Sequence, residues 1–236
     1  MVELWFKELG FYNNPFSIKP AAYNTEVFGY NLDDIFTKID SGSISLILGK
    51  YGMGKTAILK RLIAKYGGQK RLIYYSCNRT EENIDFDKLL KERNGFIGKL
   101  FNIMPNNVIL LLDEAQDMSE TDSEKLLTYY PKNLKSVVLV TSDKDELKFS
   151  NGLREMVKDN ITELKEITED DAISLIRKRI GNLETLPDDM VKLIFKRSNK
   201  NPRRLLKNCE LVCKYAVENG EDVVTEEHVK KVLKEV

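Results

Sequence analysis

One stretch of the sequence combines glycines, a lysine and a hydroxyl at a spacing that suits phosphate binding. Residues 49–56 read GKYGMGKT and fit the pattern G-x-x-x-x-G-K-[ST] in full. Such glycines let the backbone wrap a phosphate chain with its N–H groups pointing inward, and the helix that follows adds the positive end of its dipole. We expect Lys55 to reach the β- and γ-phosphates and the Thr56 hydroxyl to bind Mg²⁺. The expected phosphate contacts are Gly49, Lys50, Tyr51, Gly52, Met53, Gly54, Lys55, Thr56 and Ala57.

Two adjacent carboxylates form a second candidate element. Asp113 and Glu114 follow the run VILLL at residues 108–112, and a continuous apolar run of this kind is typical of a central strand buried on both faces. At the carboxyl edge of a sheet, beside a phosphate loop, Asp113 can hold the water shell of Mg²⁺. Glu114 can then orient and polarise an attacking water. The two elements together predict hydrolysis of a nucleoside triphosphate, with Lys55 and Glu114 as catalytic groups.

The order of the strands decides which further side chain faces the phosphates. A whole strand, expected at residues 72–76, separates the two elements in sequence, so they need not lie on adjacent strands. The strand expected at residues 137–141 is the best candidate to insert between them, with a polar residue at its end facing the γ-phosphate. Ser142 is the first candidate for that residue and Thr141 is the second. The alternative is that these side chains only cap the end of the strand.

The pattern of apolar runs predicts the elements that position these residues. Five runs rich in β-branched residues alternate with helical patterns, which predicts an α/β fold with a parallel five-stranded sheet and helices on both faces. Strands are expected at residues 44–48, 72–76, 108–112, 137–141 and 161–164, and helices near 56–66, 85–103 and 119–129. Four further helices are expected at residues 169–180, 188–197, 202–218 and 225–235. We therefore expect an α/β domain at residues 1–165 and a small all-helical lid domain at residues 166–236.

Composition and charge bear on the class of protein. The 236 residues contain 37 Lys and Arg against 37 Asp and Glu, so the chain lacks the basic excess that is usual in nucleic-acid binders. No apolar run approaches the roughly 18 residues of a membrane span, and the N-terminus lacks the pattern of a signal peptide. We therefore expect no membrane segment and a cytoplasmic location. Cys77, Cys209 and Cys213 form no disulfide pattern, and we expect buried or neutral thiols rather than a metal site.

The motifs resemble those of the AAA+ ATPases. Residues 49–56 resemble the Walker A motif, and Asp113 with Glu114 resembles Walker B. Ser142 stands at the sensor 1 position, where many relatives carry asparagine. Residues 200–205, KNPRRL, are similar to the sensor 2 motif G-N-P-R-x-L, with a lysine in place of the glycine.

The same resemblance implies roles for two arginines. Sensor 2 residues approach the nucleotide from the helical lid, which implies that Pro202 lies near the nucleotide and that Arg203 contacts the γ-phosphate. The alternative for Arg203 is a solvated helix N-terminus. Arg154 lies where such proteins often carry an arginine finger, a residue that completes the site of a neighbouring subunit. The alternative for Arg154 is an ordinary surface arginine.

Two further segments resemble one branch of the AAA+ ATPases. Residues 14–16, NPF, and residues 27–30, VFGY, are similar to the N-P-F and F-G-R/Y segments of that branch. The branch includes ExeA-type secretion ATPases, TnsC-like transposition regulators and origin-recognition initiators. In these proteins the segment, here residues 11–31, lines the adenine, which implies that Phe28 contacts the base. Residues 113–116, DEAQ, match the sequence common in the ExeA and transposition members.

The resemblance implies a Mg-ATP-binding and hydrolysing ATPase that self-assembles and acts as a switch, loader or remodeller of a macromolecular partner. The alternative is a nucleotide-dependent binding adaptor, or a signalling switch with slow hydrolysis. The implied partner is an unidentified protein or DNA, although we expect neither a winged helix nor a net basic charge to support DNA binding. A basic cluster in the lid sequence has two open interpretations: a nucleic-acid surface, or solvated helix faces and nucleotide contacts. Its members are Arg177, Lys178, Arg179, Lys196, Arg197, Lys200, Arg203, Arg204 and Lys207.

Overall fold

The computed structural model describes residues 5–19, 30–68, 71–78, 83–93 and 104–233. These residues form two compact units. The described parts of residues 30–51 and 58–164 make up the α/β unit, and those of residues 1–29, 52–57 and 165–236 make up the helical unit. No helix in the described ranges has both the length and the apolar character needed to cross a membrane.

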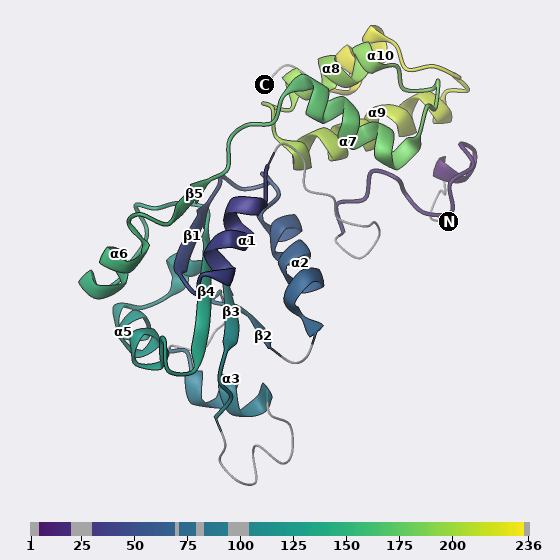
Figure 1. Ribbon diagram of the computed structural model, residues 1–236. Helices are drawn as coiled ribbons and strands as arrows, with labels where there is room; N and C mark the ends of the chain where they lie inside the picture. Colours follow the sequence, from purple (N-terminus) through teal and green to yellow (C-terminus); the bar gives the residue numbers. More distant parts are fainter. Residues whose placement is uncertain (1–4, 20–29, 69–70, 79–82, 94–103, 234–236) are drawn as a thin grey trace. The chain divides into compact units, whose positions relative to one another are not determined.

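The α/β unit is built on a five-stranded parallel sheet (Figure 1). Its strands are β1 (Ile44–Leu48), β2 (Leu72–Ser76), β3 (Val108–Asp113), β4 (Leu134–Thr141) and β5 (Ile161–Glu163). The strand order is β2-β3-β4-β1-β5, and every neighbouring pair is parallel. The prediction that the fourth strand inserts between the first and the third is therefore confirmed. β4 begins three residues earlier than the sequence pattern predicts.

Helices cover both faces of this sheet (Figure 1). They are α1 (Asp33–Asp40), α2 (Lys55–Tyr66), α3 (Phe86–Arg93), α5 (Glu120–Tyr129) and α6 (Asn151–Val157), and a short 3-10 helix, η3, spans Ala115–Asp117. Residues of α3, α5 and α6 join one core cluster with alternate residues of the strands, and α1 and α2 lie over the opposite face. The pattern of apolar runs did not predict α1 and α6. The second half of the helix predicted at residues 85–103 lies outside the described residues.

Strand β3 is enclosed by this packing. All six of its residues are buried, as the continuous apolar run predicts. Leu110 and Leu112 join the core cluster together with Leu126 of α5 and Leu153 of α6. Because both faces of β3 are covered, packing fixes the point at which the strand ends, and Asp113 is the residue that stands there.

The helical unit contains four α-helices among its described residues. They are α7 (Glu169–Ile180), α8 (Asp188–Arg197), α9 (Pro202–Glu218) and α10 (Glu226–Val232), and the first three have the bounds that the sequence predicts. α9 packs against α8 and α10 and buries Cys209 and Cys213. Burial raises the pKa of the Cys213 thiol to about 12, so this thiol is a neutral core group.

The N-terminal segment is part of the helical unit. A 3-10 helix, η1, spans Trp5–Lys7 and packs against α9, and the indole of its first residue stacks on Phe16 with 6.3 Å between ring centroids. Arg179 of α7 donates hydrogen bonds to the carbonyls of Pro15 (3.1 Å) and Ser17 (2.8 Å). Contacts with side chains and main chain therefore fasten this segment to the helices of the helical unit.

Other arginines of the basic cluster also hold the helical unit together. Arg177 pairs with Asp188 at 2.6 Å and donates to the carbonyl of Leu186 at 2.7 Å. Arg197 donates to the carbonyl of Leu233 at 2.6 Å. A guanidinium that binds carbonyls of its own unit uses those N–H donors to stabilise the fold. For these arginines the contacts favour a structural role over a nucleic-acid surface.

Two residues just before α9 adopt the left-handed backbone conformation. Their φ angles are 51° at Asn199 and 53° at Lys200. Asparagine adopts this conformation more readily than most residues, whereas for lysine it costs about 1–2 kcal/mol. Lys200 occupies the position of the glycine in G-N-P-R-x-L, so the backbone at this position gives a physical reason for that glycine. Its amine lies 3.7 Å from the carboxylate of Glu166, and both side chains are largely exposed.

We expect Lys200→Gly to raise the free energy of unfolding by about 1 kcal/mol, because glycine adopts this conformation without the steric cost of a β-carbon. Lys200→Ala is the matched control, since it removes the ion pair with Glu166 but keeps the β-carbon. An exposed pair of this kind contributes about 0–1 kcal/mol, so the alanine variant should be no more stable than the parent. Urea unfolding of the three proteins measures the difference. A glycine variant no more stable than the alanine variant would show that no strain is stored at this position.

Candidate functional site

The candidate phosphate loop leaves β1 at a buried glycine. The N–H of Gly49 donates to the carbonyl of Thr141 at 3.1 Å. A β-carbon added to Gly49 would lie 2.8 Å from Cδ1 of Leu164, which follows β5. No side chain therefore fits at position 49 unless Leu164 moves. This close approach is the physical reason for the first glycine of the motif.

The rest of the loop leads into the N-terminus of α2. The φ angles are 85° at Gly52 and 97° at Gly54, both in the region that favours glycine. α2 then begins at Lys55, whose relative exposure is only 7%, and Thr56 beside it is exposed. Of the remaining loop residues, Lys50 and Tyr51 are exposed, Met53 is buried and Ala57 is half-buried. A glycine-rich turn that opens a helix of 12 residues with a lysine is the arrangement that binds phosphate groups.

Gly52 lies close to the start of α9 within the helical unit. A β-carbon on Gly52 would stand 2.5 Å from Oδ1 of Asn201. Asn201 caps α9, because this oxygen accepts hydrogen bonds from the backbone N–H groups of Arg203 (3.0 Å) and Arg204 (3.1 Å). Pro202 occupies the first position of the helix. Residues assigned to sensor 2 from the sequence therefore begin next to the candidate phosphate loop.

Asp113 stands at the end of β3 in a fixed orientation. Its carboxylate accepts a hydrogen bond from the hydroxyl of Tyr74 at 3.2 Å and another from the N–H of Glu114 at 3.0 Å. Burial and the negative charge of Asp113 raise the pKa of Tyr74, so its hydroxyl stays protonated and remains a donor. No motif in the sequence points to Tyr74. Carboxylate oxygens, such as those of Asp113, are ligands that Mg²⁺ prefers.

Glu114 belongs to a chain of hydrogen bonds that reaches β4. Its backbone is left-handed, with φ 54° and ψ 48°. Its Oε2 accepts a hydrogen bond from Nε2 of Gln116 at 2.7 Å, and Oε1 of Gln116 accepts one from the hydroxyl of Thr141 at 2.8 Å. Thr141 is the last residue of β4, which lies between β1 and β3. The candidate water-orienting carboxylate is thus connected to the strand that neighbours the phosphate loop's own strand.

The hydrogen-bond chain has a defined direction. The hydroxyl of Thr141 is buried, and its one proton has two acceptors within reach, Oε1 of Gln116 at 2.8 Å and the carbonyl of Asp143 at 2.9 Å. Gln116 must then present its amide N–H to Glu114, because the opposite amide orientation would place two oxygens against each other. The hydrogen bonds therefore hold the amide of Gln116 between Thr141 and Glu114, and this amide constrains the carboxylate of Glu114. Gln116 belongs to the DEAQ segment, but the sequence alone indicates no role for it.

The other predicted site residues are placed as follows. Ser142 follows Thr141 at the end of β4 and is half-buried. Arg154 lies on α6, and its guanidinium donates to the carbonyls of Phe149 (2.9 Å) and Leu147 (2.6 Å). Phe28 lies outside the described residues. The roles of these residues stay predictions.

Comparisons with known proteins agree with this architecture. Residues 41–167 match the model of a family described as an AAA domain. The chain resembles the RuvB Holliday junction branch migration motor of Thermotoga maritima with a TM-score of 0.62 at 17% identity, over 86% of this chain and 69% of that chain. For Cdc6p of Pyrobaculum aerophilum the TM-score is 0.69 at 15% identity, over 93% of this chain and 71% of that chain. No curated protein matches the sequence.

A third structure, Drosophila ORC bound to DNA, gives a TM-score of 0.61 at 19% identity, over 98% of this chain and 65% of that chain. Identities this low show a shared fold and carry no further conclusion about activity. The family model is the stronger finding, because it covers more than half of the sequence, from before β1 to beyond β5. The chain therefore belongs to the AAA domain family, that of the AAA+ ATPases.

Proposed function

We propose that this chain binds Mg-ATP and hydrolyses it to ADP and phosphate. The observation that carries the proposal is the chain of hydrogen bonds from Thr141 through Gln116 to Glu114. It ends at the sheet edge where β1, β3 and β4 finish, beside the start of the candidate phosphate loop. A carboxylate that was only a solvated surface charge would not need to be linked through the half-buried Gln116 to the buried Thr141. Membership of the AAA family supports the proposal, since AAA+ proteins are generally ATPases.

Each residue of the proposed site has a separate task. The ammonium of Lys55 and the N–H groups of the loop bind phosphate oxygens. Asp113 and Thr56 hold Mg²⁺, which neutralises charge on the β- and γ-phosphates when it is bound. Glu114 orients a water molecule and accepts its proton as the water oxygen attacks the γ-phosphorus. Arg203, near the loop at the start of α9, contacts the γ-phosphate.

Gln116 acts through Glu114 and not on the nucleotide. Its amide occupies Oε2 of Glu114, so Oε1 is the oxygen left for the attacking water. The left-handed backbone of Glu114 turns the side chain away from the line of β3, and the amide then fixes the carboxylate plane. A fixed carboxylate reduces the number of orientations that must be lost before water is correctly aligned. Gln116 is therefore a positioning residue in this proposal.

The proposed hydrolysis would drive a self-assembling switch, loader or remodeller of a macromolecular partner. DNA is the first partner to test, because two structural relatives are described with a Holliday junction and with bound DNA. Within the basic cluster, Arg177 and Arg197 contribute little to that case, since they bind carbonyls of their own unit. The balance of 37 basic and 37 acidic side chains likewise gives no general attraction for DNA.

Glu114→Gln should still bind Mg-ATP, because metal coordination stays with Asp113, but its turnover should fall by about 10² or more. Lys55→Ala is the companion variant and should lose ATP affinity instead, because a charge-assisted contact to phosphate is removed. Steady-state phosphate release and equilibrium ATP binding, measured on both, separate the two roles. Wild-type turnover in Glu114→Gln would remove Glu114 from the mechanism. A parent protein that binds ATP without turnover would favour the adaptor alternative.

Gln116→Leu should lower kcat by about 10- to 100-fold and leave ATP affinity unchanged, because Glu114 loses the amide that orients it. Gln116→Glu places a second carboxylate against Glu114, which favours the protonated form of the pair, so the acidic limb of the kcat–pH profile should move to higher pH. Asp117→Asn, one residue further along η3, is the control and should change neither quantity. An unshifted pH profile in Gln116→Glu would show that residue 116 does not influence the proton-accepting carboxylate of Glu114.

ATP, but not ADP, should promote self-association, and activity per subunit should rise with protein concentration if Arg154 completes the site of a neighbour. An arginine supplied in this way is worth about 10³ or more in related phosphoryl-transfer systems. Arg154→Ala should keep ATP binding and lose the rise. Since Arg154 also binds the carbonyls of Leu147 and Phe149, loss of activity alone would not identify a finger.

Mixing therefore provides the decisive measurement for Arg154. Lys55→Ala subunits have an impaired site of their own but an intact Arg154, which they can lend to Arg154→Ala subunits. Recovery of activity in the mixture, above the sum of the separate variants, is the expected result. A mixture without recovery would indicate that Arg154 only stabilises its own loop, through the carbonyls of Leu147 and Phe149. A chain that stays monomeric with ATP would contradict self-assembly as a whole.

A further inference from the structure

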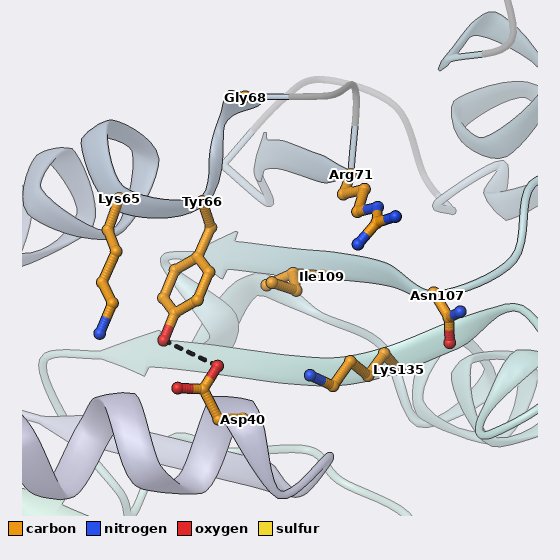
Figure 2. Close-up of a pocket in the computed structure, with 8 residues that line it drawn as sticks. All are labelled: Asp40, Lys65, Tyr66, Gly68, Arg71, Asn107, Ile109 and Lys135. Atoms are coloured by element: carbon orange, nitrogen blue, oxygen red, sulfur yellow. Dashed lines mark hydrogen bonds between the residues drawn. The ribbon is translucent and has the colours of Figure 1, made fainter.

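A cavity of about 510 Å³ lies at the amino ends of the strands, on the α/β unit (Figure 2). The last turns of α1 and α2 and the beginnings of β2, β3 and β4 form its walls. Its lining residues are Asp40, Lys65, Tyr66, Gly68, Arg71, Asn107, Ile109 and Lys135. The strands are parallel, so the carboxyl ends that carry Gly49, Asp113 and Thr141 are at the opposite edge of the sheet, a strand length of about 16 Å away. The cavity is therefore separate from the proposed ATP site.

The cavity carries an excess of positive charge. Three of its lining side chains, Lys65, Arg71 and Lys135, are cationic, and one, Asp40, is a carboxylate. Among the described residues neither Arg71 nor Lys135 forms an ion pair. Figure 2 shows these two side chains on either side of Ile109, which is buried and forms the floor between them. Two unpaired cations over an apolar floor are placed to bind an anion.

The single carboxylate of the cavity is engaged by the protein itself. Asp40 accepts a hydrogen bond from the hydroxyl of Tyr66 at 3.1 Å (Figure 2). Burial and Asp40 raise the pKa of Tyr66 to about 12, so the hydroxyl stays protonated at neutral pH and this hydrogen bond persists. Asp40 keeps its negative charge, but among the described residues it forms an ion pair with neither Arg71 nor Lys135.

Stabilisation of helix ends does not explain all three cations. Lys65 lies in the last turn of α2, where a positive charge favours the negative end of the helix dipole, and its amine also stands 3.5 Å from the centroid of the Phe36 ring. Arg71 precedes β2 and Lys135 is the second residue of β4, so neither belongs to the last turn of a helix. Their position at the same cavity calls for a different explanation.

The chemistry of the lining selects a phosphate-bearing ligand. The planar guanidinium of Arg71 can donate two parallel hydrogen bonds to a phosphate, and Lys135 adds a point charge. The cavity is several times larger than a phosphate ion and falls in the usual range for small-molecule sites, which is about 300–1,000 Å³. The ring of Tyr66 and the side chain of Ile109 add apolar surface, and Asn107 adds an amide. These features fit a ligand that joins a phosphate to a flat, partly apolar group.

We propose that this cavity is a second phosphate site, which binds the phosphate of a nucleotide unit through Arg71 and Lys135. The unit belongs either to a free nucleotide or to a nucleic-acid strand, since both present the same phosphate and base to the cavity. The site goes beyond the proposed ATP hydrolysis and does not depend on it.

Arg71→Gln/Lys135→Gln tests the site with two probes, a fluorescently labelled single-stranded oligonucleotide and ADP. Lys88→Gln/Lys125→Gln is the matched control, because it removes the same charge from two exposed lysines of α3 and α5 outside the cavity. Oligonucleotide binding is followed by anisotropy with saturating ATP present, and ADP binding by calorimetry. Thermal unfolding of each variant confirms folding, and Lys135→Gln alone replaces the double variant if that protein fails to fold.

The cavity variant should lose at least about tenfold in affinity for one of the two probes, and the control should change that affinity less than about twofold. Loss of oligonucleotide binding, with the same single ADP site in both proteins, assigns the cavity to nucleic acid. Two ADP sites in the parent and one in the cavity variant assign it to free nucleotide. Equal losses in the cavity and control variants would overturn the proposal, as would no loss for either probe or equal competition by polyglutamate. ATP turnover is measured in parallel, and its presence or absence bears only on the proposed hydrolysis.

Discussion

The candidate site depends on the position of β4 between β1 and β3. The registers of the two ladders place Thr141 level with Leu48 of β1, and Leu139 level with Leu112 of β3. The main-chain carbonyl of Thr141 then accepts the N–H of Gly49, and its hydroxyl turns to Gln116. Thr141 thus holds the start of the phosphate loop through its backbone, and through its side chain it holds Gln116, which binds the carboxylate of Glu114.

Two left-handed residues of the chain illustrate different uses of backbone strain. Such a conformation costs about 1–2 kcal/mol for a residue with a β-carbon and persists only where its surroundings enforce it. The N–H of Glu114 donates to Asp113, and its carboxylate accepts from Gln116, so side chains of the site hold it on both sides. Lys200 donates its backbone N–H to the carbonyl of Phe195 at 3.2 Å, and its side chain forms an exposed ion pair with Glu166. The backbone of Glu114 is therefore supported by the groups with which it would act, whereas Lys200 is strained by the turn into α9.

The sequence predicts those parts of the fold whose signal is local. Continuous β-branched runs locate all five strands, and amphipathic periodicity locates α7, α8 and α9 with their observed bounds. The helices α1 and α6, with 8 and 7 residues, are too short for periodicity to distinguish them from loops. The role of Gln116 could not be predicted for a different reason. Its two partners lie 2 residues before it and 25 residues after it, and only the insertion of β4 brings Thr141 within reach.

Overall charge is an equally poor guide to local chemistry in this chain. The balance of 37 basic and 37 acidic side chains indicates no preference for anions. The parallel sheet nevertheless separates charge, because strand ends of one kind gather at each edge. Asp113 and Glu114 stand at the carboxyl edge, whereas Arg71 and Lys135 stand at the amino edge. The latter two are 64 residues apart in sequence and meet only through the pairing of β2, β3 and β4. A site built from one residue per strand leaves no motif in the sequence. Its local excess of positive charge is also hidden in the balanced total charge of the chain.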